Sequence, residues 1–344
     1  WHFNPREWLK KVALINGVYL LNNPFSFQSM EKHSAYCAMI RMGFNIPDTC
    51  LIPSKHGPDT EKYRVTAAKY HDMFDLPEIA GQIGYPLYMK PFDGGGWRGV
   101  SRINNETELM QAYDLSGQML MHLQAGVDYF DVFVRSLGIG PHIISLRYDP
   151  DQPMHGRYKV EHEFLSAEKG REARIITKLI NAVFRWDFNS CEAIMKDDML
   201  WPIDFANACP DIALTSLHYY FPWAIKSLLA WSIYCVVTGR PMHITMNIED
   251  YFNIGDSDRS YEEKLAVYEQ LADAHFETEQ FEEFKATVLN DLDEAMWELA
   301  RTPEFDKILV DTVRTTFPDR EHDQFIAHYR GLMQHWVESE TNSG

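Results

Sequence analysis

The sequence predicts an α+β protein with antiparallel sheets in two lobes and a helical extension at its C-terminal end. Three β-rich runs, at residues 119–123, 129–137 and 142–147, are separated by turns that contain Gly or Pro, a pattern typical of an antiparallel meander. Apolar residues recur at helical spacing over residues 167–184. With 344 residues, the chain is long enough to build two lobes with separate cores.

The predicted elements divide the chain into four parts, residues 1–55, 56–122, 123–250 and 251–344. The first two parts mix helices with single strands, the third holds the meander, a long helix and a hairpin, and the fourth is helical with acidic faces. Apart from the meander, the elements are a strand at 12–21, helices at 30–43 and 60–73, a strand at 87–90, helices at 106–113 and 167–184, strands at 190–195 and 200–205, and helices after Ser260.

Local signals define several helix ends. Asn105 with Glu108, and Ser260 with Glu263, have the spacing of a capping box, in which each side chain accepts a hydrogen bond from the backbone of the other residue. Gly43 is expected to end the helix that begins near Met30, because glycine readily adopts the left-handed conformation found there.

The charge of the chain is strongly acidic and unevenly distributed. Fifty Asp and Glu residues against 32 Lys and Arg residues give a formal net charge of −18, and residues 256–344 alone carry 22 acidic and 8 basic residues. Such a charge repels a phosphate backbone and argues against a nucleic-acid partner, and the acidic helices would be repelled by anionic lipid headgroups. Any anion site is therefore expected in residues 1–255.

Cysteine content and hydropathy predict a protein of the cytoplasm without a membrane partner. The five cysteines are odd in number and widely spaced, with no CxxC pair. No N-terminal basic segment leads into an apolar run, as a targeting segment would. The most apolar stretch, residues 219–238, contains Lys226 and lies between polar segments, so we expect a buried helix there.

The strongest motif is a lysine at the end of a strand followed by a glycine-rich loop, Met89 to Val100. Glycines let backbone N–H groups approach phosphate oxygens, and the ammonium of Lys90 adds a positive charge. The loop has neither the order of a P-loop nor the GxGxxG fingerprint of dinucleotide-binding proteins. A glycine-rich hairpin with a surface lysine is the structural alternative.

A second motif places carboxylates in otherwise apolar strands. Glu192, Asp204 and Asn207 belong to the predicted hairpin, and their oxygen atoms are the ligands that Mg²⁺ prefers. Burying such charges without a cation would be costly. The alternative is that the acids face solvent on an edge strand.

Taken in order, these motifs resemble the ATP-grasp superfamily, which includes D-alanine–D-alanine ligase, glutathione synthetase and the ribosomal-protein glutamate ligase. The resemblance covers residues 22–210, well over half of the chain. It is carried by Asn22-Asn23-Pro24, Glu31-Lys32-His33-Ser34, Gly43-Phe44-Asn45-Ile46-Pro47, Gly84 to Pro91 with the loop that follows, the hinge Leu120-Met121-His122-Leu123-Gln124, and Gly126 to Val134.

This resemblance implies an ATP-grasp fold, in which two α+β lobes with antiparallel sheets clasp ATP. Residues 1–55 would be the remnant of an N-terminal lobe with the lysine-bearing helix, residues 56–122 the small lobe with its flap, residues 123–250 the large lobe with the metal site, and residues 251–344 the acidic extension. The implied activity is an ADP-forming ligase that uses ATP and Mg²⁺, or Mn²⁺, to join a small-molecule carboxylate to an amine. Related enzymes are often dimers, so a homodimer is expected.

The resemblance also implies roles for individual residues. Lys32 and Lys90 would contact the phosphates of ATP, the hinge would hold adenine, Asp128 would bind ribose, and three residues of the hairpin would bind the metal. The implied set is Lys32, Lys90, Gly94, Gly95, Gly96 and Arg98 for the phosphates and flap, Leu123, Gln124 and Asp128 for the nucleoside, and Glu192, Asp204 and Asn207 for the metal.

Three departures from the family pattern keep other functions open. Asp204 and Asn207 are three residues apart instead of two and need a β-bulge to converge, or Asp211 substitutes for Asn207. The arginine expected two residues before Glu192 is absent, and the positive charge is assigned to Arg157 and Lys159, with Arg147 and Arg185 as alternatives. The N-terminal lobe is short. A phosphoryl transferase and a non-catalytic nucleotide-binding scaffold remain as alternatives.

Overall fold

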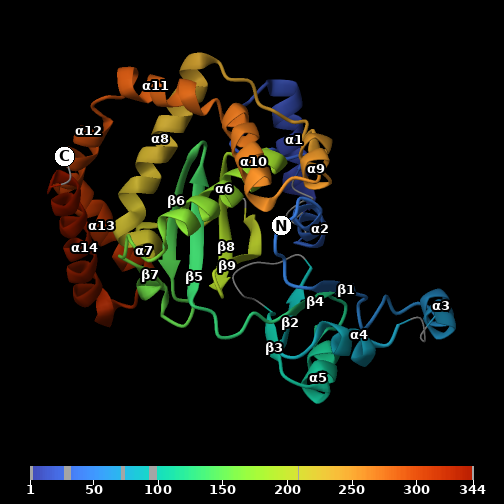
Figure 1. Ribbon diagram of the computed structural model, residues 1–344. Coiled ribbons are helices and arrows are strands. Elements are labelled where there is room, and N and C mark those ends of the chain that lie inside the picture. The colour runs from blue at the N-terminus through green and yellow to red at the C-terminus, as the bar shows by residue number, and fades with distance from the viewer. Residues whose placement is uncertain (1–2, 27–31, 71–73, 93–98, 208, 343–344) are drawn as a thin grey trace.

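A computed structural model describes residues 3–26, 32–70, 74–92, 99–207 and 209–342 of the chain (Figure 1). The strands are β1 Thr49–Ile52, β2 Leu87–Pro91, β3 Ser101–Ile103, β4 Met121–Ala125, β5 Val132–Ile139, β6 His142–Tyr148, β7 Tyr158–Lys159, β8 Phe188–Lys196 and β9 Met199–Asn207. The helices are α1 Phe3–Asn16, α2 Lys32–Arg41, α3 Glu61–Tyr70, α4 Leu76–Ile83, α5 Glu106–Ser116, α6 Ala167–Phe184, α7 Leu214–Leu217, α8 Phe221–Thr238, α9 Ile248–Gly255, α10 Tyr261–Phe276, α11 Thr278–Val288, α12 Leu292–Ala300, α13 Pro303–Thr316 and α14 His322–Asn342. Two antiparallel sheets and a C-terminal helical region confirm the predicted fold class.

The small lobe is a four-stranded antiparallel sheet in the order β1-β4-β2-β3. Its apolar face packs on α4 and α5, with Ile52, Leu87, Met89 and Leu123 in the core. Because successive side chains of a strand point to opposite faces, the other face carries the polar residues of the same strands. The small sheet extends beyond the predicted part of residues 56–122, because β1 lies before residue 56 and β4 extends past residue 122.

The large lobe is a five-stranded antiparallel sheet in the order β7-β6-β5-β8-β9. Apolar residues of one face, such as Val134 and Ala193, pack on α6, and α10 packs on α6 in turn. The opposite face packs on α8 near Gly140 in the β5–β6 turn. A Cβ atom on Gly140, whose φ is +54°, would lie 2.4 Å from the Trp231 ring, so this close approach requires glycine.

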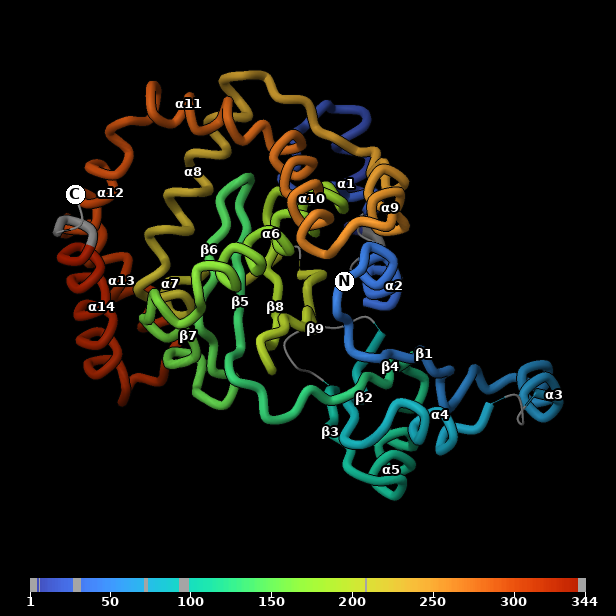
Figure 2. The backbone as a smooth tube through the Cα atoms, viewed as in Figure 1, coloured from blue at the N-terminus to red at the C-terminus, as the bar shows by residue number. Residues whose placement is uncertain are grey.

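Helix α2 joins the two lobes. It contacts β1 of the small sheet and β9 of the large sheet, and its Tyr36 hydroxyl donates a hydrogen bond to the Ile203 carbonyl over 2.7 Å. Figure 2 shows α2 between the two sheets, with α9 and α10 beside it. The first residue of this helix, Lys32, is therefore close to the large sheet although the helix begins far from that sheet in the sequence.

Several predicted elements are confirmed and two are wrong. The helices predicted from periodicity and capping are present, and both Asn105 and Ser260 accept a hydrogen bond from the backbone N–H three residues later. The strand predicted at 12–21 is wrong, because residues up to Asn16 belong to α1. The three-stranded meander is also wrong: β4 pairs with β1 and β2 in the small lobe, and only β5 and β6 form a hairpin.

The C-terminal helices form a layer along one side of the large lobe (Figure 1). In α8, Trp231 is buried while Val236 and Val237 are exposed, so the predicted burial holds for one face of the helix. The segment Leu214–Thr238 is long and apolar enough to cross a membrane by length and composition, a test that the core helix of a soluble protein also passes. Helix α14 packs against the segment before β7, where the His155 ring lies 4.8 Å from that of Phe325.

A buried polar network fastens this layer to the large sheet. The Asp187 carboxylate, which is 4% exposed, accepts hydrogen bonds from the Tyr19 hydroxyl over 2.5 Å and from Trp231 Nε1 over 3.0 Å. Arg240 Nη1 lies 4.0 Å from the same carboxylate, and its Nη2 donates to the His275 carbonyl. A buried charge of this kind is tolerated because a partner of opposite charge lies beside it.

Replacing Asp187 by Ala is expected to lower the free energy of unfolding by about 3 kcal/mol, because Arg240 would stay buried without this partner. Urea denaturation followed by circular dichroism measures the change. The matched control is Asp59→Ala, which removes an exposed ion pair with Arg64 and should change stability by less than about 0.5 kcal/mol. Equal effects of the two substitutions would contradict the assigned role of the network.

Candidate active site

The register of β8 and β9 brings the predicted metal-binding residues onto one face of the large sheet. Glu192 pairs with Asp204 and Ser190 pairs with Asn207, so between these pairs one residue of β8 lies opposite two residues of β9. This β-bulge turns Asn207 to the same face as Asp204, and its Nδ2 donates to Ser190 Oγ over 2.9 Å. The bulge that the unusual spacing required is therefore present.

Each of the two carboxylates has a cation beside it. Lys32 Nζ of α2 forms a close ion pair with Asp204 Oδ2. Arg135 Nη1 of β5 lies 3.3 Å from Glu192 Oε1, and both side chains of this pair are 14% exposed. Glu192 thus faces neighbouring strands rather than open solvent, so the edge-strand alternative is not supported for it, whereas the Asp204 side chain, on the edge strand β9, is 31% exposed.

Burial and neighbouring charges shift the pKa of Glu192 in opposite directions. Desolvation raises its pKa and the nearby carboxylate of Asp204 does the same, whereas Arg135, Lys32 and Lys90 lower it, and the net shift is upward. A carboxyl group with a raised pKa gains from an added cation, because the cation favours the ionised form.

The oxygen donors suit a hard divalent cation. Within the part of the chain that the structure describes, no group of three or more His, Cys, Asp and Glu side chains is arranged to hold a metal. The donors on this face are two carboxylates and one amide oxygen, from Glu192, Asp204 and Asn207. Mg²⁺ is commonly held by one or two carboxylates together with phosphate oxygens, so the residues present fit this ion in a nucleotide complex.

Lys90 faces the same region from the small lobe. Its Nζ donates to Gln124 Oε1 over 2.6 Å, and Gln124 Nε2 donates to Thr49 Oγ1 over 2.9 Å. Burial lowers the pKa of Lys90 to about 8; Asp204 and Glu192 oppose this shift and the positive charge of Lys32 adds to it. The charges of the large lobe and α2 therefore act on Lys90 across the space between the lobes.

The other predicted nucleotide-binding residues are placed less favourably. Leu123 is fully buried in the core of the small lobe, on the face opposite Lys90, so its side chain is not part of this site. The carboxylate of Asp128 already forms an ion pair with Arg102. Gly94, Gly95, Gly96 and Arg98 lie outside the described residues.

The structure corrects the choice of the cation that compensates for the missing arginine. Lys159 pairs with Arg147, which pairs with Val134, so Lys159 lies on the α6 face of the sheet and not on the face of Glu192. Arg157 donates to the Gln152 carbonyl over 2.9 Å and to the Tyr148 hydroxyl over 3.4 Å. The alternation of side chains along a strand excludes Lys159 from the site.

Arg135 lies beside Glu192, and the sequence prediction did not include it. Its Nη2 donates to Ser190 Oγ over 3.4 Å. The guanidinium lies 5.3 Å from the centre of the Tyr148 ring and 5.9 Å from that of Tyr158, in cation–π contact. A single arginine in an apolar strand, between Phe133 and Leu137, was the available signal.

Neither remaining alternative from the sequence joins this group. Asp211 accepts hydrogen bonds from the Ala213 backbone N–H and the Ser216 hydroxyl at the start of α7, and so its carboxylate does not take the place of Asn207. Arg185 donates to the carbonyls of Thr245 and Met246, both over 2.8 Å.

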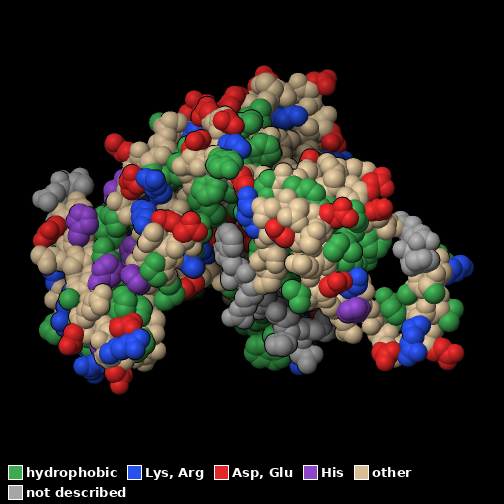
Figure 3. Space-filling model, turned by 90° about the horizontal axis from the view of Figure 1, so that it is seen from below, with side chains coloured by type: hydrophobic (Ala, Val, Ile, Leu, Met, Phe, Trp, Pro, Cys, Tyr) green, Lys and Arg blue, Asp and Glu red, His purple; other side chains and the backbone are tan. Residues whose placement is uncertain are grey.

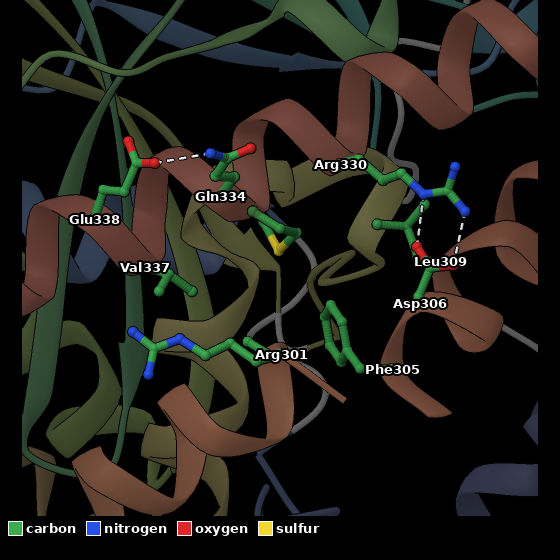
Figure 4. A pocket seen from close by; sticks show the side chains of 10 residues that line it. Arg301, Phe305, Asp306, Leu309, Arg330, Gln334, Val337 and Glu338 are labelled. Atoms are coloured by element: carbon green, nitrogen blue, oxygen red, sulfur yellow. Dashed lines mark hydrogen bonds and ion pairs between the residues drawn. The ribbon is translucent and has the colours of Figure 1, made fainter. Parts of the chain in front are cut away.

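A cavity of about 390 Å³ lies elsewhere, among the C-terminal helices (Figure 4). Phe305 and Leu309 of α13 and Val337 of α14 contribute apolar lining, and Arg330 forms a bidentate ion pair with Asp306 at one end, with both distances 2.6 Å. Seen from below, the molecule is hollowed between these helices and the small lobe (Figure 3). None of the residues predicted to bind ATP or metal lines the cavity.

Comparisons with known proteins add similarities of fold. No family model and no curated protein matches the sequence. Among solved structures, the chain is similar to biotin carboxylase from Campylobacter jejuni, with 16% identity, a TM-score of 0.46, and 76% of this chain and 55% of that chain covered. It is also similar to N5-carboxyaminoimidazole synthase from Aspergillus clavatus in complex with ADP and 5-aminoimidazole ribonucleotide, with 14% identity, a TM-score of 0.43 and coverages of 58% and 50%.

A third similar structure is D-alanine–D-alanine ligase from Bacillus anthracis complexed with ATP, with 13% identity, a TM-score of 0.39 and coverages of 70% and 67%. These solved proteins are ATP-grasp enzymes, the superfamily that the sequence resembles. This chain spans between half and three fifths of the length of the first three solved chains that it matches.

The lowered pKa of Lys90 predicts that nucleotide affinity depends on pH. Phosphate binding favours the charged ammonium, whose fraction in the free protein falls as the pH rises through about 8. The Kd of ATP should therefore increase between pH 7 and pH 9, by up to about tenfold per pH unit above pH 8. Isothermal titration calorimetry measures this. Lys90→Arg, which stays charged, should flatten the profile, and an unchanged profile in this variant would contradict the assignment.

Proposed function

We propose that this chain is an ATP- and Mg²⁺-dependent ligase that activates a small-molecule carboxylate as an acyl phosphate and joins it to an amine, releasing ADP and phosphate. The observation that carries the proposal is the arrangement of charges between the lobes. Lys32 of α2 and the two acids of the large lobe are close enough to Lys90 of the small lobe to act on its pKa. Cations from one side and metal-binding oxygens from the other suit a bound polyphosphate.

The first half-reaction needs neutralisation of phosphate charge. A carboxylate oxygen of the substrate forms a bond to the γ-phosphorus of ATP, and the bond from that phosphorus to the oxygen of ADP breaks. Lys32 and Lys90 would hold the phosphates and offset the charge that develops on their oxygens. When bound, Mg²⁺ supplies positive charge to the same oxygens, and Glu192, Asp204 and Asn207 would hold it.

The second half-reaction needs a cation near the carbonyl carbon. The amine nitrogen attacks that carbon and loses a proton, and phosphate leaves with the electrons of the C–O bond. Arg135 is the group on this face that is suited to stabilise the developing oxyanion, because its guanidinium offers several N–H donors in fixed directions. Tyr148 and Tyr158 hold this guanidinium by ring contacts on the side away from Glu192.

The test of the reaction class is ADP release from Mg·ATP with pooled carboxylates, with and without pooled amino acids and other amines, and with hydroxylamine added to trap an acyl phosphate as a hydroxamate. Turnover that needs both pools, or hydroxamate formation, supports the ligase. Turnover that yields a stable phosphorylated product without an amine supports a phosphoryl transferase. Tight nucleotide binding without turnover in any pool supports a scaffold.

Lys90→Ala and Glu192→Gln should each reduce ADP release by about 100-fold or more, because each removes charge that acts on the transferred phosphoryl group or its metal. A coupled assay for ADP measures the rate. Lys62→Ala and Glu161→Gln are the matched controls, since Lys62 is exposed on α3 and Glu161 forms a surface pair with Arg147. Activity that survives both site substitutions would locate the chemistry elsewhere.

Arg135→Lys separates the two half-reactions. The ammonium keeps the positive charge beside Glu192 but loses the fixed set of N–H donors, so amide formation should fall by about 10²–10³-fold while the Kd of ATP stays within about threefold. Hydroxamate trapping should still detect the acyl phosphate. Amide formation at the rate of the unaltered protein would contradict the role of Arg135.

A further inference from the structure

His122 is a fully buried imidazole at the phosphate end of the small lobe that none of the assigned roles uses. It lies on β4 directly opposite Lys90 of β2, on the same face of the sheet. Its ring stacks on that of His33, with centroids 5.4 Å apart, and the rings of Phe92 and Tyr36 lie 5.7 Å and 6.0 Å away. Two rings of α2 and the Phe92 ring, directly after β2, therefore surround it.

Both ring nitrogens of His122 are buried and have no hydrogen-bond partner among the residues that the structure describes. A buried polar group without a partner costs about 1–3 kcal/mol, and such groups in folded proteins usually have a functional or structural reason. An apolar side chain of similar shape would fill the same aromatic surroundings without this cost. The retained imidazole thus points to a partner that is present only when the site is occupied.

The groups around His122 indicate what that partner is. Burial, the neighbouring His33 ring and the positive charges of Lys32 and Lys90 lower the pKa of His122 to about 3, so the ring is neutral and carries one N–H donor. The Tyr36 hydroxyl already donates to the Ile203 carbonyl. The charged neighbours that act on the ring are cations, so the missing acceptor has the chemistry of an anion.

We propose that His122 is a phosphate-binding residue of the nucleotide site, and that its neutral imidazole donates a hydrogen bond to a phosphoryl oxygen held between Lys32 and Lys90. This inference rests on the proposed function, because it requires a polyphosphate in that position. It adds to the two lysines a donor without charge, which is oriented by its strand and by the His33 ring.

The test is His122→Phe, with Kd values for Mg·ATP, Mg·tripolyphosphate and adenosine measured by calorimetry. Affinity for ATP and for tripolyphosphate should fall by about ten- to a hundredfold, as expected for loss of a hydrogen bond to a charged group. Affinity for adenosine should not change. The melting temperature of the nucleotide-free protein should be equal or higher, because the substitution removes an unpaired polar group.

Two further variants exclude a merely structural effect. His122→Gln keeps an N–H donor and should recover part of the affinity for tripolyphosphate. His275→Phe removes another buried imidazole with an unpaired Nε2, far from the site, and should leave all three Kd values unchanged. If His122→Phe does not fold, the ring ¹⁵N signals of His122 in the unaltered protein test the proposal instead. Tripolyphosphate should shift these signals, and unshifted signals at saturation would overturn the proposal.

The outcomes distinguish this inference from the proposed function. If the unaltered protein does not bind ATP in a Lys90-dependent way, the proposed function fails first and this inference with it. If it does, but His122→Phe binds tripolyphosphate as the unaltered protein does, only the inference is overturned. Equal losses for adenosine and tripolyphosphate would also overturn it, because they would mean a general distortion of the pocket.

Discussion

Two carboxylates of the large sheet, Glu192 of β8 and Asp204 of the edge strand β9, have cations beside them, and this electrostatic pairing joins the parts of the chain that form the candidate site. Lys32 reaches Asp204 from α2, and Arg135 reaches Glu192 from the adjacent strand. A charge in a medium of low polarity is costly without a partner. The position of α2 against β9 brings Lys32 to Asp204, and the register of β5 with β8 brings Arg135 to Glu192. The same two carboxylates act on Lys90 of the small lobe, where they oppose the lowering of its pKa by burial.

The two lobes contribute unlike chemistry to the space between them. The large lobe supplies oxygen donors and an arginine on one face of β5, β8 and β9, and the small lobe supplies a lysine, an amide and a neutral imidazole on one face of β2 and β4. The other face of the small sheet is apolar and packs on α4 and α5, whereas the large sheet packs on helices with both faces, α6 on one and α8 on the other. Period-two alternation along the strands thus separates the polar groups from the core in the small lobe, and in the large lobe the polar groups share one face with core residues.

The C-terminal helices bear on this site indirectly. They cover the α8 side of the large sheet and the segment before β7, and the network of Asp187, Arg240 and Trp231 fastens them to the sheet. Their strong negative charge belongs to residues 256–344, whereas Lys32, Lys90 and Arg135 lie before residue 256 in the sequence. The cavity among these helices has both apolar and charged lining, and neither Glu192 nor Asp204 lines it.

The sequence by itself determined the elements with strong local signals and the identity of most chemical groups: the capped helices at Asn105 and Ser260, the helix at 167–184, the lysine before the glycine loop, and the acid-bearing hairpin. It could not decide the secondary structure of the apolar run at 12–21, since such a run suits a helix as well as a strand. It also could not decide which of the two sheets residues 121–125 join. Only the tertiary structure decided that Asn207 shares a face with Asp204, that Lys159 does not, that Arg135 lies beside Glu192, and that His122 lies opposite Lys90. Which side chains meet across strands depends on register and bulges, and these are set by pairing between segments far apart in the chain.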